Sequence, residues 1–167
     1  IESNTWVKES KIERVLPNSI KISIVEKTPI AIWQSNYGNK LITKNGEIIS
    51  ASNINFFKNH LPIIKGNKAN EYISSILNIV RKNQDLSQHI WSLTFINERR
   101  WDLRFNQGLI IRLPEVGASD AWKMIVKLEK NYKILNLRLT EIDLRNSSQI
   151  LAKINLKKDL ILKRNNL

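Results

Sequence analysis

Apolar and polar residues alternate most regularly just after the first proline of the chain. Ile20, Ile22 and Ile24 alternate with Lys21, Ser23 and Val25, which is the period-two pattern of a strand with one buried face. The preceding residues, 16–19, read Leu-Pro-Asn-Ser and predict a tight turn, because proline fixes φ while Asn and Ser bond their own backbone. Residues 11–15 then form the partner strand. We expect residues 1–10 to hold the last turns of a helix that leads into this hairpin.

Helical spacing appears twice further along the chain. Residues 68–83 place Tyr72, Ile73, Ile76, Leu77 and Val80 at intervals of three and four. A second helix is expected after Gly117, with Ser119 or Asp120 as its N-cap. Its apolar face carries Trp122, Ile125, Leu128 and Tyr132.

The remaining apolar segments are short, are bounded by turn residues and predict strands. Asn45-Gly46, between alternating apolar residues, predicts a hairpin with a type I′ turn. Further strands are expected at residues 89–97, 101–105, 109–113, 137–145 and 149–154. Strand-rich segments separated by two helices predict an α+β fold: a hairpin, then a mostly antiparallel or mixed sheet with two helices packed on one face.

Composition narrows the function classes. The chain has 167 residues, 42% of them hydrophobic, and no cysteine, which excludes disulfides and thiolate chemistry. His60 and His89 lie far apart and have no metal-ligand spacing. Glu26 and Glu47 are candidate carboxylates, but nothing in the sequence brings them together as an acid–base pair. We therefore expect no catalytic, metal or cofactor site.

The net charge of +12 has two interpretations. It indicates either a polyanionic partner, nucleic acid or an anionic surface, or a composition biased toward Lys, Asn and Ile. The scattered lysines favour the second. Arg100-Trp101 and Arg104-Phe105 could form a stacking platform for bases, but strict alternation favours a strand that buries Trp101 and Phe105. A basic nucleic-acid or anionic-surface module stays the alternative function.

Several strings resemble the FtsQ/DivIB family of bitopic cell-division proteins. Trp6-Val7 is followed by V/I-x-R-x-x-P-N-S-I-x-I-x-I-x-E-x-x-P-I-A-x-W, which ends at Trp33. A block L-I-x-x-x-G-x-I opens at Leu41, and R-R-W-D-L-R-x-x-x-G-L-x-I-x-L-P-E covers residues 99–115. Residues 142–145 match the string I/V-D-L-R that precedes the last strand of the family. The resemblance extends over essentially the whole chain.

The resemblance implies an extracytoplasmic region that holds the C-terminal part of a POTRA domain and a β domain. We expect the partial POTRA domain at residues 1–35, the FtsQ-type β domain at 38–156 and a basic tail at 157–167. A cytoplasmic tail, one transmembrane helix and the first part of the POTRA domain would precede this region. The full protein would then lie in the inner membrane, with this part in the periplasm and enriched at the division septum.

The resemblance also implies a role in the divisome without catalysis, in which FtsB in complex with FtsL adds a strand to the last strand of the sheet. That strand is expected at residues 146–154, with Arg145 and Arg99 pairing partner acids. The implied partner-binding residues are Arg99, Leu135, Arg145, Asn146, Ser147, Ser148, Gln149, Ile150, Leu151, Ala152 and Ile154. Asn146, Gln149 and Ile154 replace an aromatic residue, a glycine and a tryptophan of other members. A different POTRA-bearing protein is a further alternative, although the single hairpin argues against it.

Overall fold

The structure is a computed structural model that describes residues 4–35, 37–51, 53–146 and 148–155. Its contacts divide the chain into two compact units, Ile1–Ser74 and Ser75–Leu167, which are described separately. The domain bounds expected from the sequence, 1–35 and 38–156, stay predictions, and the tail at 157–167 lies outside the described residues.

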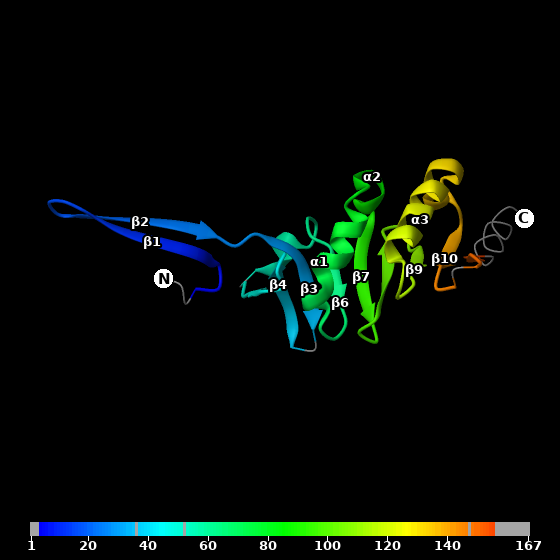
Figure 1. The fold of residues 1–167 in the computed structure, drawn as a ribbon, viewed down its shortest axis with the longest axis horizontal. Helices are drawn as coiled ribbons and strands as arrows, with labels where there is room; N and C mark the ends of the chain where they lie inside the picture. The colour runs from blue at the N-terminus through cyan, green and yellow to red at the C-terminus, as the bar shows by residue number, and fades with distance from the viewer. Residues whose placement is uncertain (1–3, 36, 52, 147, 156–167) are drawn as a thin grey trace, which may run out of the picture. The chain divides into compact units, whose positions relative to one another are not determined.

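The first unit begins with a two-stranded hairpin. Strands β1 (Val7–Val15) and β2 (Ser19–Glu26) pair antiparallel, with Ile12 opposite Ile22, and run side by side in Figure 1. The expected turn at residues 16–19 is confirmed. The expected helix over residues 1–10 is wrong where the structure describes it, because β1 already starts at Val7. There the backbone N–H and C=O groups are bound by β2, so the local helical pattern gives way to strand pairing.

The rest of the first unit is a sheet with the strand order β6-β3-β4-β5. Its strands are β3 (Pro29–Ser35), β4 (Gly38–Thr43), β5 (Ile48–Ile49) and β6 (Ile63–Lys65). Strand β3 is parallel to β6, whereas β3–β4 and β4–β5 are antiparallel. The 3-10 helix η1 (Ile54–Phe57) packs Phe57 against a buried cluster of Ile32, Leu41 and Ile49.

The loop between β4 and β5 is a hairpin, as Asn45-Gly46 predicts, but of another type. The Gly46 N–H donates to the Thr43 carbonyl, and the Thr43 N–H donates to the Glu47 carbonyl, so the loop is residues 44–46. Gly46 alone among the loop residues has a positive φ, 79°. A type I turn followed by a left-handed glycine fits this pattern. Two successive residues with positive φ, as a type I′ turn requires, occur instead at Asn97 and Glu98, with φ of 51° and 56°.

Two longer helices appear where the periodicity predicts them. Helix α1 (Ala69–Val80) buries Ile73, Ile76, Leu77 and Val80, whereas Tyr72 is exposed. Helix α3 (Ala118–Tyr132) buries Trp122 and Ile125, and Tyr132 is exposed. Its N-cap is Gly117, without a capping side chain, so the expected cap at Ser119 or Asp120 is wrong. Short pieces α2 (Gln84–Ser87) and η2 (Ile134–Asn136) follow α1 and α3 respectively.

The second unit holds a mixed sheet with the order β11-β10-β9-β8-β7. Its strands are β7 (Ile90–Ile96), β8 (Arg100–Phe105), β9 (Ile110–Arg112), β10 (Leu139–Asp143) and β11 (Leu151–Ile154). Helix α3 connects β9 to the parallel strand β10, and the other pairs are antiparallel. The predicted α+β class with a mixed sheet is confirmed.

One face of this sheet is apolar and the other is charged. Leu103, Ile111 and Ile142 are cross-strand neighbours and are buried. Their strand neighbours Asp102, Arg112 and Asp143 form the next cross-strand row and point to the opposite face. On β8 the aromatic residues Trp101 and Phe105 are buried, which confirms the strand interpretation over the stacking platform.

Candidate partner-binding edge

Strand β11 is the last strand of the sheet in the second unit. It pairs antiparallel with β10, with Asp143 opposite Leu151, Ile142 opposite Ala152 and Glu141 opposite Lys153. Within the described residues no strand pairs with its other side. All four residues of β11 are exposed. The sheet therefore ends in an open edge.

The direction of the backbone groups along β11 follows from its hydrogen bonds. The Asn155 N–H donates to the Arg138 carbonyl at 2.9 Å, and the Lys153 carbonyl accepts from Thr140 Oγ1 at 3.3 Å. Because the hydrogen-bonding direction alternates along a strand, the groups of Leu151 and Lys153 face β10. The N–H and C=O groups of Ala152 and Ile154 therefore point away from the sheet.

The strand is shorter than the sequence predicts. The expected strand at 146–154 is wrong in its first part, since β11 starts only at Leu151. Asn146 Oδ1 accepts from the Ser148 N–H at 3.0 Å and from Ser148 Oγ at 2.7 Å, and the Gln149 N–H donates to the Asn146 carbonyl. An Asn side chain that bonds its own backbone competes with the ladder and makes a turn. Ser147 lies outside the described residues.

Arg145 does not stand free beside the edge. Its Nε donates to both Asp143 carboxylate oxygens at 2.9 Å, its Nη2 donates to Oδ2 at 2.6 Å, and its backbone N–H donates to Oδ1 at 3.0 Å. These bonds hold the pKa of Asp143 below its usual range, against the effect of burial. The pair fixes the chain where it leaves β10. Asp143 thus binds the arginine that was expected to bind a partner acid.

A second group of charged side chains lies on the same face of the sheet, around Glu141, two residues before Asp143 on β10. Glu141 accepts from Arg112 Nη2 at 3.0 Å and from Lys153 Nζ at 3.1 Å. The Lys153 hydrogen bond is the largest influence on the pKa of Glu141 and lowers it, while burial acts in the opposite direction. The Glu141 carboxylate therefore accepts hydrogen bonds from two cations. Sequence reasoning missed Glu141 and Lys153, although alternation along residues 139–143 places Glu141 and Asp143 on one face.

The charged face continues inward to Asp102. Arg100 Nε lies 3.6 Å from Asp102 Oδ1, and both side chains are mostly buried. Burial raises the pKa of Asp102, while the positive charges of Arg100, Arg112 and Arg145 act to lower it. Charged side chains of this face thus extend from β8 to β11, and their charges influence one another.

The remaining residues predicted to contact a partner differ in how exposed they are and in what they touch. Arg99 precedes β8 and is 61% exposed, with its Nε 3.9 Å from Glu115. The registers place the start of β8, the end of β10 and the start of β11 at the same end of the sheet. Leu135 is buried in η2, so its side chain contributes to the core rather than to the surface. Gln149 and Leu151 line a hollow of about 240 Å³ together with Asp143, Arg145 and Asn146.

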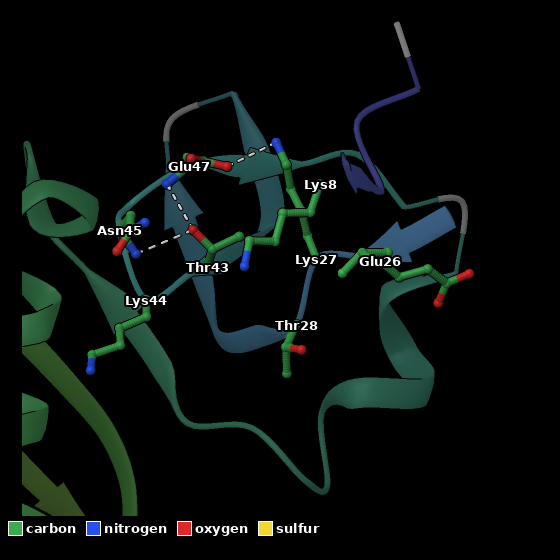
Figure 2. Close-up of a pocket in the computed structure, with 9 residues that line it drawn as sticks. Lys8, Glu26, Lys27, Thr28, Thr43, Lys44, Asn45 and Glu47 are labelled. Atoms are coloured by element: carbon green, nitrogen blue, oxygen red, sulfur yellow. Dashed lines mark hydrogen bonds and ion pairs between the residues drawn. The ribbon is translucent and has the colours of Figure 1, made fainter. Parts of the chain in front are cut away.

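A larger pocket of about 400 Å³ lies in the first unit, between the hairpin exit and the β4–β5 loop. Figure 2 shows Lys27 reaching Glu47, with Nζ 2.8 Å from Oε2, and Thr43 Oγ1 accepting from the N–H groups of Asn45 and Glu47. Lys8 and Glu26 line the same space. Its acids and lysines mostly offset one another, and the Lys27–Glu47 pair ties the two loops together.

The described residues hold neither a metal cluster nor a membrane-spanning helix. Among those residues no group of three His, Cys, Asp or Glu side chains could hold a metal ion. None of the helices in this part of the chain is both long and apolar enough to cross a membrane. An open strand edge beside a charged face is typical of domains that bind other proteins.

Comparisons with known proteins place the chain in a family. The family model "Cell division protein FtsQ/DivIB, C-terminal" matches residues 31–145. The cell division protein FtsQ of Rickettsia bellii is 37% identical over 149 residues, which are 89% of this chain and 55% of that protein. FtsQ of Caulobacter vibrioides is 30% identical over 145 residues, 87% of this chain and 48% of that protein. The chain belongs to the FtsQ/DivIB family of cell division proteins.

The chain spans about half the length of these curated relatives, 55% and 48%. Among solved structures it is similar to the major extracytoplasmic domain of the trans isomer of the cell division protein DivIB from Geobacillus stearothermophilus. That match has a TM-score of 0.43 and 12% identity, and covers 66% of this chain and 97% of that domain. The family match stops at residue 145, so strand β11 lies beyond it.

Proposed function

We propose that this chain is a non-catalytic interaction module of the bacterial divisome and that β11 receives a strand from the FtsB–FtsL complex. The observation that carries the proposal is the open edge, where the N–H and C=O groups of Ala152 and Ile154 point away from β10. A strand laid along this edge satisfies those groups. The family membership supports the setting in cell division.

Main-chain pairing is the expected source of affinity. Each backbone hydrogen bond is worth about 0.5–1.5 kcal/mol net, and strand addition needs free N–H and C=O groups rather than particular side chains. The departures from the family at Asn146, Gln149 and Ile154 are compatible with this mode. Leu151 and Ile154 are 56% and 61% exposed, so a partner strand would also bury apolar surface.

The acids of this edge support binding rather than catalysis. Asp143 is held by Arg145, and Glu141 is shared between Arg112 and Lys153. A general base needs a carboxylate that can take up a proton from a substrate. These carboxylates are ion-paired, and the lowered pKa values of Asp143 and Glu141 disfavour proton uptake.

We further propose that this region lies in the periplasm, as part of a protein anchored in the inner membrane by one helix, and the family membership supports this setting. The divisome setting then brings β11 within reach of partners held in the same membrane. The partner residues proposed here are those of the edge and its turn: Arg99, Arg145, Asn146, Ser148, Gln149, Ile150, Leu151, Ala152 and Ile154.

The test is proline at Ala152. Ala152→Pro removes an outward N–H and places the ring where the partner carbonyl would lie, while an edge strand tolerates proline. We expect the variant to fold and its affinity for the soluble FtsB–FtsL complex to fall about tenfold or more, which corresponds to about 1.4 kcal/mol. Titration calorimetry measures the affinity and circular dichroism the fold.

Ala152→Thr is the matched control, because threonine keeps the N–H and favours strands. It should bind like the unchanged chain. If Ala152→Pro folds and binds as tightly as Ala152→Thr, the partner does not pair with β11 and the proposal is wrong.

A further inference from the structure

Lys153 is the outermost cation of the charged face. It lies on β11, opposite Glu141 on β10, and its side chain is 69% exposed. Its side chain shares the face of Asp143 and Glu141, since cross-strand neighbours point to the same side. A strand added to β11 would therefore run directly beside it.

The charge of Lys153 is only partly compensated. Its carboxylate partner Glu141 also accepts from Arg112 at 3.0 Å, so Lys153 shares this carboxylate with a second cation, which itself also lies opposite Asp102 and Asp143. The Arg112 side chain is 30% exposed and that of Lys153 69%, so Lys153 is the more accessible of the two. An additional carboxylate would balance the group.

Arg145 is less suited to that role. Its guanidinium makes three hydrogen bonds to Asp143, so a partner acid would have to compete with a carboxylate two residues away in the chain. Lys153 makes one hydrogen bond to Glu141, through a flexible ammonium that can donate to another acceptor.

Each charged cross-strand pair of this face joins opposite signs, whereas Asp143 is opposite Leu151 and Glu141 is opposite Ile110 on their other neighbouring strands. Asp102 on β8 is opposite Arg112 on β9, and Arg112 is opposite Asp143 on β10. In the next row Glu141 on β10 is opposite Lys153 on β11. Opposite charges on neighbouring strands stabilise the pairing, whereas like charges oppose it. The position beyond Lys153 therefore favours a negative charge.

We propose that Lys153 selects the partner strand by pairing with a carboxylate on the face that the strand shares with Glu141 and Asp143. This rests on the proposed function, because it presumes strand addition at β11. The acid would lie opposite or diagonal to Lys153, with Cβ atoms about 5–8 Å apart. The partner segment is thus a strand with Asp or Glu on one face.

The first test changes the sign of the charge. Lys153→Glu should weaken binding of the soluble FtsB–FtsL complex about five- to tenfold at low salt, and the difference should shrink as salt rises. Lys127→Glu, an equal change at an exposed position of α3, is the matched control and should have an effect of less than about twofold. An equal loss in both variants would mean that only net charge matters and would overturn the proposal.

The second test separates selection from a structural role. Glu141→Gln leaves Lys153 without its carboxylate, so the lysine should bind a partner acid about two- to fivefold more tightly. If Lys153 only held β11 against β10, the same variant would weaken binding, and that result would overturn the proposal. Hydrogen exchange at β11 checks that the strand remains paired in both variants.

The outcomes distinguish this proposal from the function on which it rests. If Ala152→Pro abolishes binding but Lys153→Glu does not weaken it, the edge binds the partner and Lys153 does not select it. If neither variant weakens binding, strand addition at β11 is itself wrong. If Lys153→Glu weakens binding, changing the paired acid of the partner to lysine should restore it.

Discussion

The edge strand of the first unit is covered by side chains, whereas the edge strand of the second unit is open. In the first unit the end strand is β5, which has only two residues, Ile48–Ile49. The residue after it, Ser50, donates its N–H to Thr5 Oγ1 at 3.1 Å and accepts from Trp6 Nε1 at 2.8 Å. In the second unit the end strand β11 has no such cover within the described residues.

The difference shows what a protected edge requires. Thr5 and Trp6 bind the backbone of Ser50 through side chains, so they block pairing without continuing the ladder. Proteins usually block, shorten or charge their edge strands, because free N–H and C=O groups pair with other chains. The open edge of β11, unlike the covered edge of β5, leaves the backbone groups that the proposed partner strand would need.

The largest expected effect comes from removing the cover of β5. The Trp6 ring lies 6.1 Å from that of Phe57 and packs against the cluster of Ile32, Leu41 and Ile49. Trp6→Ala should lower the free energy of unfolding by about 3 kcal/mol, at the low end for Trp truncation because the ring is half-buried. Urea unfolding measures this loss, and hydrogen exchange should rise at Ile49 and Ser50.

Trp6→Phe separates packing from the hydrogen bond. It keeps an aromatic ring but loses the indole donor to Ser50, so the loss should be about 1 kcal/mol. Unchanged exchange at Ser50 in both variants would mean that Trp6 does not protect this edge, and the contrast with β11 would disappear.

The next effect concerns what holds β11 in place. Asp143→Asn removes the charge that binds Arg145, and the free energy of unfolding should fall by about 1.5–3 kcal/mol, the usual value for hydrogen bonds to charged groups. We expect the loss to appear as faster hydrogen exchange in β10 and β11. Asp120→Asn, at an exposed Asp that pairs with Lys123, is the control and should change little.

The same pair makes the β11 edge sensitive to acid. The pKa of Asp143 is lowered in the folded chain. Its stabilisation is therefore complete above the unfolded value of about 3.9 and is lost as the pH falls through the folded value. Stability should fall below about pH 4 in the unchanged chain and more gently in Asp143→Asn. Part of the slope should remain, because the pKa of Glu141 is lowered too. An identical slope in both chains would contradict the role of Asp143.

Periodicity predicted most of the helices and strands, but the buried face expected at Ile20, Ile22 and Ile24 is wrong, because these side chains are 69%, 52% and 51% exposed. The helical spacing of Ile73, Ile76 and Val80 and the alternation of Trp101, Leu103 and Phe105 each predict the element and its buried face. The exact starts of two strands were harder to predict, because they depend on which hydrogen-bond partners the backbone groups take. The start of β1 depends on pairing with β2, and the late start of β11 depends on the side chain of Asn146 bonding to Ser148.

The position of the last strand could be predicted from the sequence, but the side-chain contacts around it could not. The string that ends at Arg145 locates the last strand, yet the sequence does not show that Asp143 occupies the arginine. Glu141 and Lys153 are twelve residues apart, and only the register of β10 and β11 brings them together. Side-chain contacts between strands depend on the register, which the sequence pattern leaves open.

The smallest expected effect tests whether charge contributes to the covered edge. Lys27 Nζ lies 2.8 Å from Glu47 Oε2, directly before β5, and the two side chains are 21% and 50% exposed. Lys27→Met should lower the free energy of unfolding by less than about 1 kcal/mol, because exposed ion pairs gain little over hydration. The double variant with Glu47→Gln isolates the pair, and its coupling should vanish near 1 M salt, where the Debye length is about 3 Å. A coupling that survives high salt, or a loss as large as that of Trp6→Ala, would mean that this edge is closed by charge. The two edges would then differ in which charges they hold rather than in whether side chains cover the backbone.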